Sequence, residues 1–299
     1  DNTPVLHWIN DSKIWVNNHA HVLGELNKQY KLKYIYYYLS IVDVSSIVKG
    51  VPPKINQANM RNIKIPIPSL ETQEKIVKIL DKFTNYVTEL QTELQTELQS
   101  RTKQYNYYRD MMLSEDYLNK ISEELSNLES KRDIHWKKIN EVCVRQKGIN
   151  ITAEKMKELN KENAPIKIFA GGNTVAKINI EDIGEEKILN KPSVIVKSRG
   201  NVDFEYYDKP FSHKNEMWSY STLNDKILNI KFLYYFLKSN IKYFKDNAIS
   251  GKLPQISTGV TDNYKVPLPH IIIQNKIVEI LDKFQDLLQD TQGLLPQEI

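Results

Sequence analysis

The sequence predicts mixed α/β (α+β) domains joined by long antiparallel coiled-coil helices, with an internal repeat that relates the two copies by a pseudo-twofold axis. Three observations support this fold class. A segment recurs at an offset of about 201 residues, each copy changes from mixed to helical periodicity at a Pro-x-Pro motif, and each copy continues as an apolar row on one helix face. The 299 residues, 40% of them hydrophobic, are enough for about two domains.

The repeat is long and collinear. Its best-matched part shares Pro-x-Pro, a glutamine and Lys-Ile-Val-x-Ile-Leu-Asp-Lys-Phe, and a three-residue length difference precedes the earliest match. Solenoid repeats have periods of about 20–50 residues, so a 200-residue period indicates a duplicated domain with its connecting helix. The chain covers about one and a half periods, and we expect it to be incomplete at both ends. The matched segments are residues 33–39 with 231–237, 50–55 with 251–256, and 65–83 with 266–284.

A long helix is predicted to follow each Pro-x-Pro motif, because the prolines require extended backbone and stop a preceding helix. From Glu71 to about Met112 there is no Gly or Pro, and apolar residues recur at helical spacing, which predicts a helix of some 40 residues, roughly 60 Å long. Such a helix needs a partner to bury its apolar row, and we expect the second copy to pack against it antiparallel. The expected spacer and partner-docking residues are Ile76, Leu80, Phe83, Val87, Leu90, Leu94, Leu98, Ile277, Leu281 and Phe284.

The tetrapeptide Thr-Glu-Leu-Gln occurs three times in tandem within this helix, at residues 88–99. Simple low complexity in a good helix former is one interpretation. The other is a spacer, because each unit adds about one turn and roughly 6 Å without interrupting the leucine row. The pattern favours a ruler of adjustable length between two modules.

The globular parts alternate short β-branched runs with Gly, Asn and Asp loops, which indicates mixed α/β structure. The elements expected are a strand or helix at residues 136–144, a polar helix at 151–160, strands at 166–169, 175–180 and 194–196, and a buried aromatic helix at 232–244.

Charge is distributed unevenly along the chain. Residues 1–70 hold 8 basic and 4 acidic side chains and residues 131–272 hold 24 and 16, whereas residues 71–130 hold 7 and 12 and residues 273–299 hold 2 and 5. A polyanion is attracted to the first pair of segments and repelled by the second, although ordinary surface lysine gives the same counts. With one cysteine, no apolar run of 18 residues and no leader pattern at the first residue, we expect a soluble protein of a reducing compartment.

The motifs of several enzyme classes are incomplete. Asp246 stands where a phosphate-binding loop before Gly251-Lys252 requires glycine, and the Pro-Pro pair lacks the flanking residues of an amino-methyltransferase. His19 and His21 have no third ligand nearby, and Cys143 lies among apolar neighbours. We therefore expect no catalytic residue, no metal and no cofactor in this chain. Residues 169–172 and the acidic cluster at 182–187 are interpreted as turns.

Taken together, the Pro-x-Pro, Gln and Ile-Val-x-Ile-Leu-Asp-Lys-Phe signature, the duplication, the tandem tetrapeptide and residues 101–109 resemble the specificity (S) subunits of type I restriction-modification systems. The resemblance implies two target-recognition domains, each reading half of a bipartite DNA sequence, and long helices that set the gap and dock partners. It divides the chain into residues 1–69 (C-terminal part of the first recognition domain), 70–130 (central helix), 131–271 (second recognition domain) and 272–299 (start of the second helix).

The resemblance also implies the partners. These are double-stranded DNA, methyltransferase (M) subunits, expected to be two, and restriction/translocase (R) subunits, in the bacterial cytoplasm at the nucleoid and without a membrane. S-adenosylmethionine, ATP and Mg²⁺ are expected on the partner subunits only, which would carry out adenine methylation or restriction.

DNA contacts are expected on polar loops that can enter the major groove, with cations nearby for phosphates. The loop after the strand at 194–196 resembles the family's Ser-Arg-Gly loop, and another candidate loop precedes the second Pro-x-Pro motif. The expected DNA-binding residues are Gly171, Gly172, Asn173, Thr174, Lys197, Ser198, Arg199, Asn201, Lys214, Gly251, Lys252 and Gln255, with Lys49, Gly50 and Lys54 in the first domain.

Two other function classes stay open on the sequence. One is a coiled-coil scaffold with protein-binding globular ends, and the other is a nuclease with an unrecognised site. Salt-dependent binding to duplex DNA would separate the first from a DNA-recognition subunit, because neutralised phosphates release counterions and a scaffold releases none.

Overall fold

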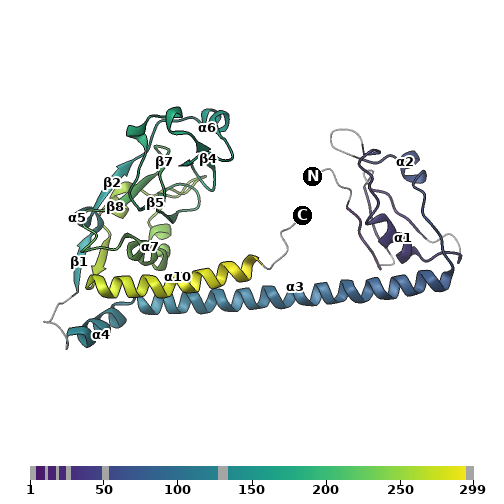
Figure 1. The fold of residues 1–299 in the computed structure, drawn as a ribbon, viewed down its shortest axis with the longest axis horizontal. Coiled ribbons are helices and arrows are strands. Elements are labelled where there is room, and N and C mark those ends of the chain that lie inside the picture. Colours follow the sequence, from purple (N-terminus) through teal and green to yellow (C-terminus); the bar gives the residue numbers. More distant parts are fainter. Residues whose placement is uncertain are drawn as a thin grey trace. The chain divides into compact units, whose positions relative to one another are not determined.

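The computed structural model describes residues 5–10, 13–17, 20–24, 28–48, 54–126 and 134–293. The chain divides into two compact units, residues 1–95 (the first unit) and residues 96–299 (the second unit) (Figure 1). Within the described ranges, every helix is too short or too polar to cross a bilayer.

The first unit contains two short helices and the start of a long one. These are α1 (Leu32–Leu39), α2 (Gln57–Arg61) and α3 (Leu70–Met112). The side chain of Asn56 caps α2 by accepting the N–H of Asn59 at 2.7 Å. Between α2 and α3 the Pro-x-Pro motif is not helical, because proline has no N–H to donate and disfavours helix in the residue before it.

Helix α3 is uninterrupted over 43 residues, or about 65 Å at 1.5 Å per residue, and it contributes to both units. It follows Ser69, whose hydroxyl accepts the N–H of Thr72 at 3.3 Å. Inside the helix, Thr88 and Thr92 donate their hydroxyls to the carbonyl four residues earlier, at 2.9 and 2.8 Å. The helix predicted for residues 71–112 is therefore confirmed.

The second unit is mixed α/β, as predicted. Its strands are β1 (His135–Lys138), β2 (Cys143–Lys147), β3 (Ile166–Phe169), β4 (Val175–Ile178), β5 (Ser193–Lys197), β6 (Asp203–Tyr207), β7 (Phe211–His213), β8 (Trp218–Thr222) and β9 (Lys265–Leu268). A four-stranded antiparallel sheet has the order β2-β8-β5-β6, and a three-stranded sheet has the order β4-β3-β7 with β3 and β7 parallel. Strands β1 and β9 form an antiparallel pair that brings the start of the globular part to the strand before the last helix.

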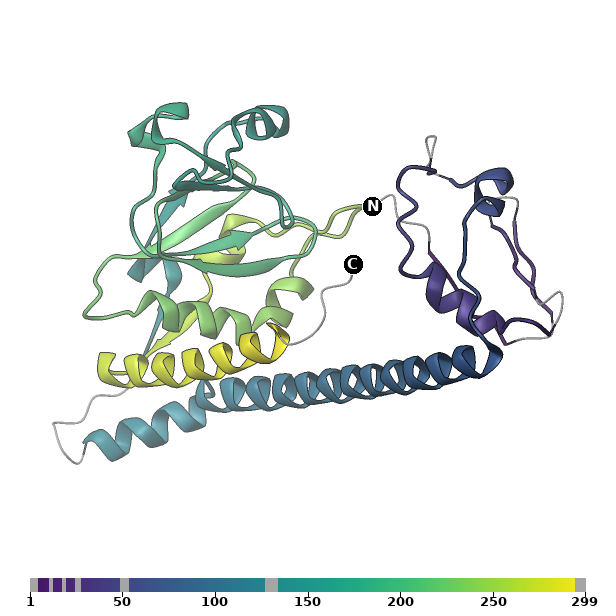
Figure 2. The same ribbon diagram turned by 45° about the vertical axis from the view of Figure 1, so that its right-hand side comes forward.

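The helices of the second unit surround these sheets. They are the end of α3, α4 (Glu115–Ser126), α5 (Ile139–Val142), α6 (Ala153–Leu159), α7 (Ile230–Ser239), α8 (Ile241–Asp246), α9 (Thr258–Asp262) and α10 (Ile271–Gly293), with 3-10 turns at Ile180–Asp182 and Glu185–Lys187. Helix α7 lies between the four-stranded sheet and α10 (Figure 2). Helix α10 lies beside residues 96–112 of α3 and runs in the opposite direction (Figures 1 and 2).

The main core fills the space between the four-stranded sheet, α7, α10 and the end of α3. Val194 and Tyr220 from the sheet, Leu233 from α7 and Leu281 from α10 have no exposed surface. Fully burying such a side chain stabilises a fold by about 1.5–3 kcal/mol, so this layer fixes α7 against the sheet. Cys143 belongs to the same core, as predicted, and burial raises the pKa of its thiol to about 12.

Two helices differ from the sequence prediction. The single aromatic helix expected at residues 232–244 is two helices, because the side-chain amide of Asn240 donates to the carbonyl of Phe236 at 2.8 Å and ends α7. The residues that follow Met112 form the separate helix α4, which the sequence pattern did not indicate.

The apolar row predicted along both long helices is buried in only part of its length. In α10, Ile277 and Leu281 are buried, and the Phe284 ring stacks on Tyr108 of α3 with ring centroids 5.5 Å apart. In α3, Ile76, Leu80, Leu94 and Leu98 are half-buried. Phe83, Val87 and Leu90 of α3 are 63%, 52% and 58% exposed, and their role in partner docking stays a prediction.

Candidate DNA interface

Two of the predicted loops, residues 198–201 (the arginine loop) and residues 249–256 (the lysine hairpin), lie side by side in the second unit. The N–H of Gly200 donates to the carbonyl of Pro254 at 2.8 Å, and a second backbone bond of 3.0 Å is accepted by the carbonyl of Ser198. Gly200 has a φ of 78°, in the left-handed region that glycine adopts without strain. The two loops are therefore held together by backbone hydrogen bonds, although they are far apart in the sequence.

The joined loops expose two cations and two amides. Arg199, Asn201, Lys252 and Gln255 are all exposed. Neither Arg199 nor Lys252 has an ion pair within the described ranges, whereas the two lysines predicted beside them are both paired. An unpaired, solvent-facing guanidinium or ammonium is free to contact a base edge or a phosphate.

The third predicted loop, residues 171–174 (the glycine loop), contacts the end of β5, directly before the arginine loop. It turns at Gly172, which has a φ of 69°, and the N–H of Ala170 donates to the carbonyl of Thr174 at 2.9 Å. The side-chain oxygen of Asn173 accepts from Lys197, at the end of β5, at 3.4 Å. The fold thus brings all three predicted loops of the second unit to one place, with the glycine loop exposed.

Three of the predicted contacts differ in the structure. The Ser198 side chain is 1% exposed and donates to the carbonyl of Glu216, so its assignment as a DNA contact is wrong, because its hydroxyl faces inward. Lys197 is paired with Glu205 at 2.8 Å and Lys214 with Glu216 at 3.2 Å, and both lysines are largely covered. These charges are neutralised within the unit and support the loops. The two glutamates were missed because nothing in the local sequence pairs them with those lysines.

A buried polar network lies behind the loops. His213 has no exposed surface, and its Nε2 lies 3.0 Å from the hydroxyl of Ser219. The side-chain oxygen of Gln146 accepts from Ser219 at 2.7 Å and from Ser193 at 3.1 Å. Burial lowers the pKa of His213 to about 4, so the ring is neutral at physiological pH. The network connects β2, β5, β7 and β8, and therefore both larger sheets.

Gly148 allows the chain to pass close to β7. A Cβ at this position would lie 2.3 Å from the carbonyl oxygen of Lys214, a distance at which the two atoms would overlap. Only glycine, which has no Cβ, fits here. The neighbouring Ile149 donates its N–H to the carbonyl of His213 at 2.7 Å. Gly148 thus fixes the segment that carries Lys214, and the sequence alone gave no signal of this close approach.

In the first unit, the predicted DNA-binding residues are only partly within the described ranges. Lys54 is described and exposed. Lys49 and Gly50 lie outside the described residues. His21, considered above as a metal ligand, instead has its Nε2 2.9 Å from the carbonyl of Ile55. Among the described residues, no group of three His, Cys, Asp or Glu side chains is placed to hold a metal ion.

Comparison with known proteins places this architecture in a family. The sequence pattern of the type I restriction modification DNA specificity domain matches residues 6–100 and 120–299, which is most of the chain. The chain belongs to this family. The resemblance found in the sequence is therefore confirmed.

The similar proteins support the same assignment. A Haemophilus influenzae protein assigned to the type I restriction enzyme specificity subunits is 31% identical over 94% of this chain and 71% of its own length. The EcoR124I/EcoR124II specificity subunit of Escherichia coli is 29% identical over 90% of this chain and 67% of its own. Among solved structures, the S subunit from M. genitalium has a TM-score of 0.52 and 19% identity over 89% of this chain and 69% of its own. That likeness supports the fold.

Proposed function

We propose that this chain is the DNA-recognition subunit of a type I restriction-modification complex, and that its second unit reads one half of a bipartite target. One observation carries the proposal. The arginine loop and the lysine hairpin are joined by backbone hydrogen bonds and expose two cations, Arg199 and Lys252, that have no ion pair within the described ranges. A nucleic-acid reader needs this combination, because rigid loops place the charges while the charges contact phosphates and bases.

The two cations are suited to different contacts. A guanidinium can bind guanine O6 and N7 through two hydrogen bonds in the major groove, so Arg199 is the proposed base reader. The Lys252 ammonium, at the tip of the hairpin, is the proposed phosphate anchor. The amides of Asn173, Asn201 and Gln255 can each pair with an adenine edge. Arg199 then supplies discrimination, and Lys252 supplies affinity that is independent of sequence.

We further propose that the two units are duplicated recognition modules whose long helices form an antiparallel coiled coil. The internal repeat at an offset of 201 residues and the opposite directions of α3 and α10 support this arrangement. The tandem tetrapeptide within α3 would act as the spacer between modules. The exposed row of Phe83, Val87 and Leu90 offers a docking surface for M subunits, two of which would methylate adenine while R subunits restrict unmodified DNA.

We infer that the chain itself is non-catalytic and acts in the cytoplasm at the nucleoid. S-adenosylmethionine, ATP and Mg²⁺ would be bound by the partner subunits. The neutral, buried state of His213 and the buried thiol of Cys143 support this inference, because neither group can reach a substrate.

The test compares Arg199→Ala and Lys252→Ala in DNA-binding measurements over a range of salt concentrations. Arg199→Ala should weaken binding to the cognate site by ~1–3 kcal/mol and leave random duplex nearly unchanged. Lys252→Ala should weaken both about equally and make the salt dependence shallower. Lys283→Ala is the control, because Lys283 is exposed on α10 and paired with Glu279. Equal losses on both DNAs for Arg199→Ala would make it a phosphate contact instead.

A scaffold with protein-binding ends is the second candidate, since the exposed apolar row on α3 is also a protein-binding feature. The same measurements separate the two functions. Affinity for duplex DNA that is unaffected by salt, or absent from the complete complex, would favour the scaffold.

A further inference from the structure

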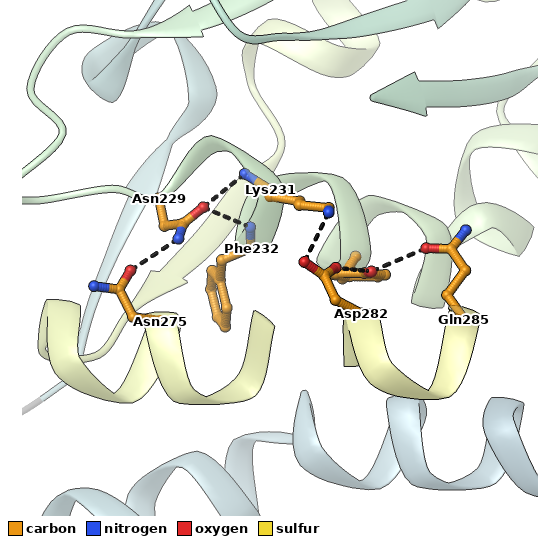
Figure 3. Close-up of polar contacts among 7 residues, drawn as sticks. Asn229, Lys231, Phe232, Asn275, Asp282 and Gln285 are labelled. Atoms are coloured by element: carbon orange, nitrogen blue, oxygen red, sulfur yellow. Dashed lines mark hydrogen bonds and ion pairs between the residues drawn. The ribbon is translucent and has the colours of Figure 1, made fainter. Parts of the chain in front are cut away.

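A polar joint fixes α7 to α10 in the second unit (Figure 3). Lys231 on α7 pairs with Asp282 on α10 at 2.7 Å, and the hydroxyl of Tyr235 donates to the same carboxylate. Tyr235 also lies 3.0 Å from the side-chain oxygen of Gln285. The ammonium of Lys231 is capped by the ring of Tyr206, whose centroid is 5.1 Å away. The Asp282 carboxylate on α10 thus binds two side chains of α7.

The first unit contains the same joint between α1 and α3. Lys33 pairs with Asp81 at 2.8 Å, and the hydroxyl of Tyr37 donates to Asp81 at 2.5 Å. The Tyr37 hydroxyl also lies 3.4 Å from that of Thr84. The Lys33 ammonium is 5.5 Å from the ring centroid of Trp8. The lysine, the tyrosine and the aspartate are identical in the two joints, and an aromatic ring covers the lysine in both.

A buried glutamine completes each joint. Gln73 and Gln274 have no exposed surface, and each donates its side-chain N–H at 2.8 Å to the carbonyl of the second proline of its Pro-x-Pro motif. Each accepts a backbone N–H from the start of the domain helix, from Lys31 at 2.8 Å and from Asn229 at 2.9 Å. The paired positions are Trp8 and Tyr206, Lys31 and Asn229, Lys33 and Lys231, Tyr37 and Tyr235, Gln73 and Gln274, Asp81 and Asp282, and Thr84 and Gln285.

The polar contacts of the joint are suited to fixing the angle between the two helices that they connect. Apolar side chains would hold two helices together with less constraint, because apolar packing tolerates small changes of angle and register. The side chains of Tyr235, Gln73 and Gln274 are fully buried and must keep their hydrogen bonds, and hydrogen bonds weaken steeply away from their preferred geometry. Burial and the bond to Asp282 raise the pKa of Tyr235, so its hydroxyl stays protonated and donates to the carboxylate. Each joint therefore favours one orientation of a recognition domain relative to its long helix.

We propose that the two joints are positioning devices, which hold each set of base-reading loops at a fixed angle on its long helix and thereby make the DNA gap a single length. The inference rests on the proposed function, since a gap exists only for a bipartite reader. It concerns Tyr37, Asp81, Tyr235 and Asp282, none of which is among the predicted base contacts. Loosening a joint should therefore leave both half-site sequences unchanged and widen the range of gaps that the complex accepts.

The test uses Tyr37→Phe, Tyr235→Phe and the double variant in a strain that carries the complete system, with methylated sites mapped across the genome. Phenylalanine retains the ring and removes only the hydroxyl that donates to the carboxylate. The controls are Tyr36→Phe, whose ring centroid lies 5.4 Å from that of Tyr37, and Tyr243→Phe on α8, which packs against Phe244 and outside the joint. Since a hydrogen bond to a charged group shifts an equilibrium by roughly tenfold or more, sites with gaps one base pair longer or shorter should rise about tenfold over the controls.

Tyr235 has no exposed surface whereas Tyr37 is half-buried, so Tyr235→Phe should widen the gap more than Tyr37→Phe, and the double variant should widen it further. The methylated half-sites should stay the same in all three. Lys231→Arg, which keeps the ion pair, should preserve the single gap, whereas Lys231→Met should widen it. If a double variant does not accumulate, the single variants decide the test against their own controls.

A single unchanged gap in variants that accumulate normally would overturn the inference, as would a changed half-site sequence. Failure of the proposed function looks different. In that case the unmodified system would yield no bipartite methylated sequence that disappears when the gene for this chain is deleted.

Discussion

Deleting one tetrapeptide, Thr92–Gln95, from α3 should shorten the unspecified gap of the DNA target by about one base pair. The deletion removes about 6 Å of helix and turns the remainder by about 40° beyond a full turn. Duplex DNA turns by roughly 34–36° per base pair, so one base pair matches the rotation. The 6 Å alone would correspond to nearly two base pairs at ~3.4 Å per step, which sets the upper limit of the change.

The helix should survive this deletion because the sequence is periodic. Leu98 takes the position of Leu94, and both are half-buried. Thr96 takes the position of Thr92, whose hydroxyl donates to the carbonyl of Thr88 at 2.8 Å, so that bond is re-formed. The proposed DNA-binding residues of both units lie outside the deleted turn, so the sequence preferences of the two half-sites should be unchanged.

The assay is a genome-wide map of methylated sites in a strain carrying the complete system. Two controls separate length from composition. Thr92→Ala keeps the length and should keep the gap, whereas a two-residue deletion turns the helix by about 200° and should abolish methylation. An unchanged gap with full methylation after the four-residue deletion would refute the ruler and leave the repeat as filler.

Three further predictions concern the fold behind the site. Gly148→Ala should destabilise the second unit by roughly 1–3 kcal/mol in thermal denaturation, because its Cβ would lie 2.3 Å from the Lys214 carbonyl oxygen, and an unchanged melting temperature would contradict this. Burial in the folded state lowers the pKa of His213 to about 4, so His213 should contribute its full share to the free energy of unfolding above the ordinary histidine pKa of about 6.5. As the pH drops towards 4, the free energy of unfolding should fall by up to roughly 3 kcal/mol. In denaturant titrations His213→Gln should show no such dependence on pH. In the isolated chain, Leu281→Ala should lower the free energy of unfolding by about 2–5 kcal/mol and Val87→Ala by less than about 0.5 kcal/mol, since only Leu281 is buried. Equal losses of stability would show that the exposed row on α3 is covered in solution.

Local sequence signals predicted much of the fold. The helix expected at residues 71–112 is α3, and the strand expected at residues 166–169 coincides with β3. Both segments carry their signal in consecutive residues, through uninterrupted helical spacing in one and a short β-branched run in the other. The break at Asn240 escaped prediction because its cause is a side-chain hydrogen bond to Phe236, which periodicity does not reveal.

The loops of the candidate site could be predicted from the sequence, but the ion pairs and hydrogen bonds between their side chains and the rest of the unit could not. The three loops of the second unit were identified from their residue types, and the fold brings them together. The sequence could not show that Ser198 turns inward, or that Glu205 and Glu216 neutralise two of the predicted lysines, because these contacts join separate strands and loops. The exposure of Phe83 likewise depends on what lies beside α3 and not on the spacing of its apolar residues.

The backbone ladder between the arginine loop and the lysine hairpin has a consequence for how this family could acquire new targets. The two loops are held by carbonyl and N–H groups, which every replacement except proline retains. Arg199 and Gln255 can therefore be exchanged for other side chains while the loop framework stays where it is. Mutation can then explore new base preferences one position at a time, without first passing through chains that fail to fold.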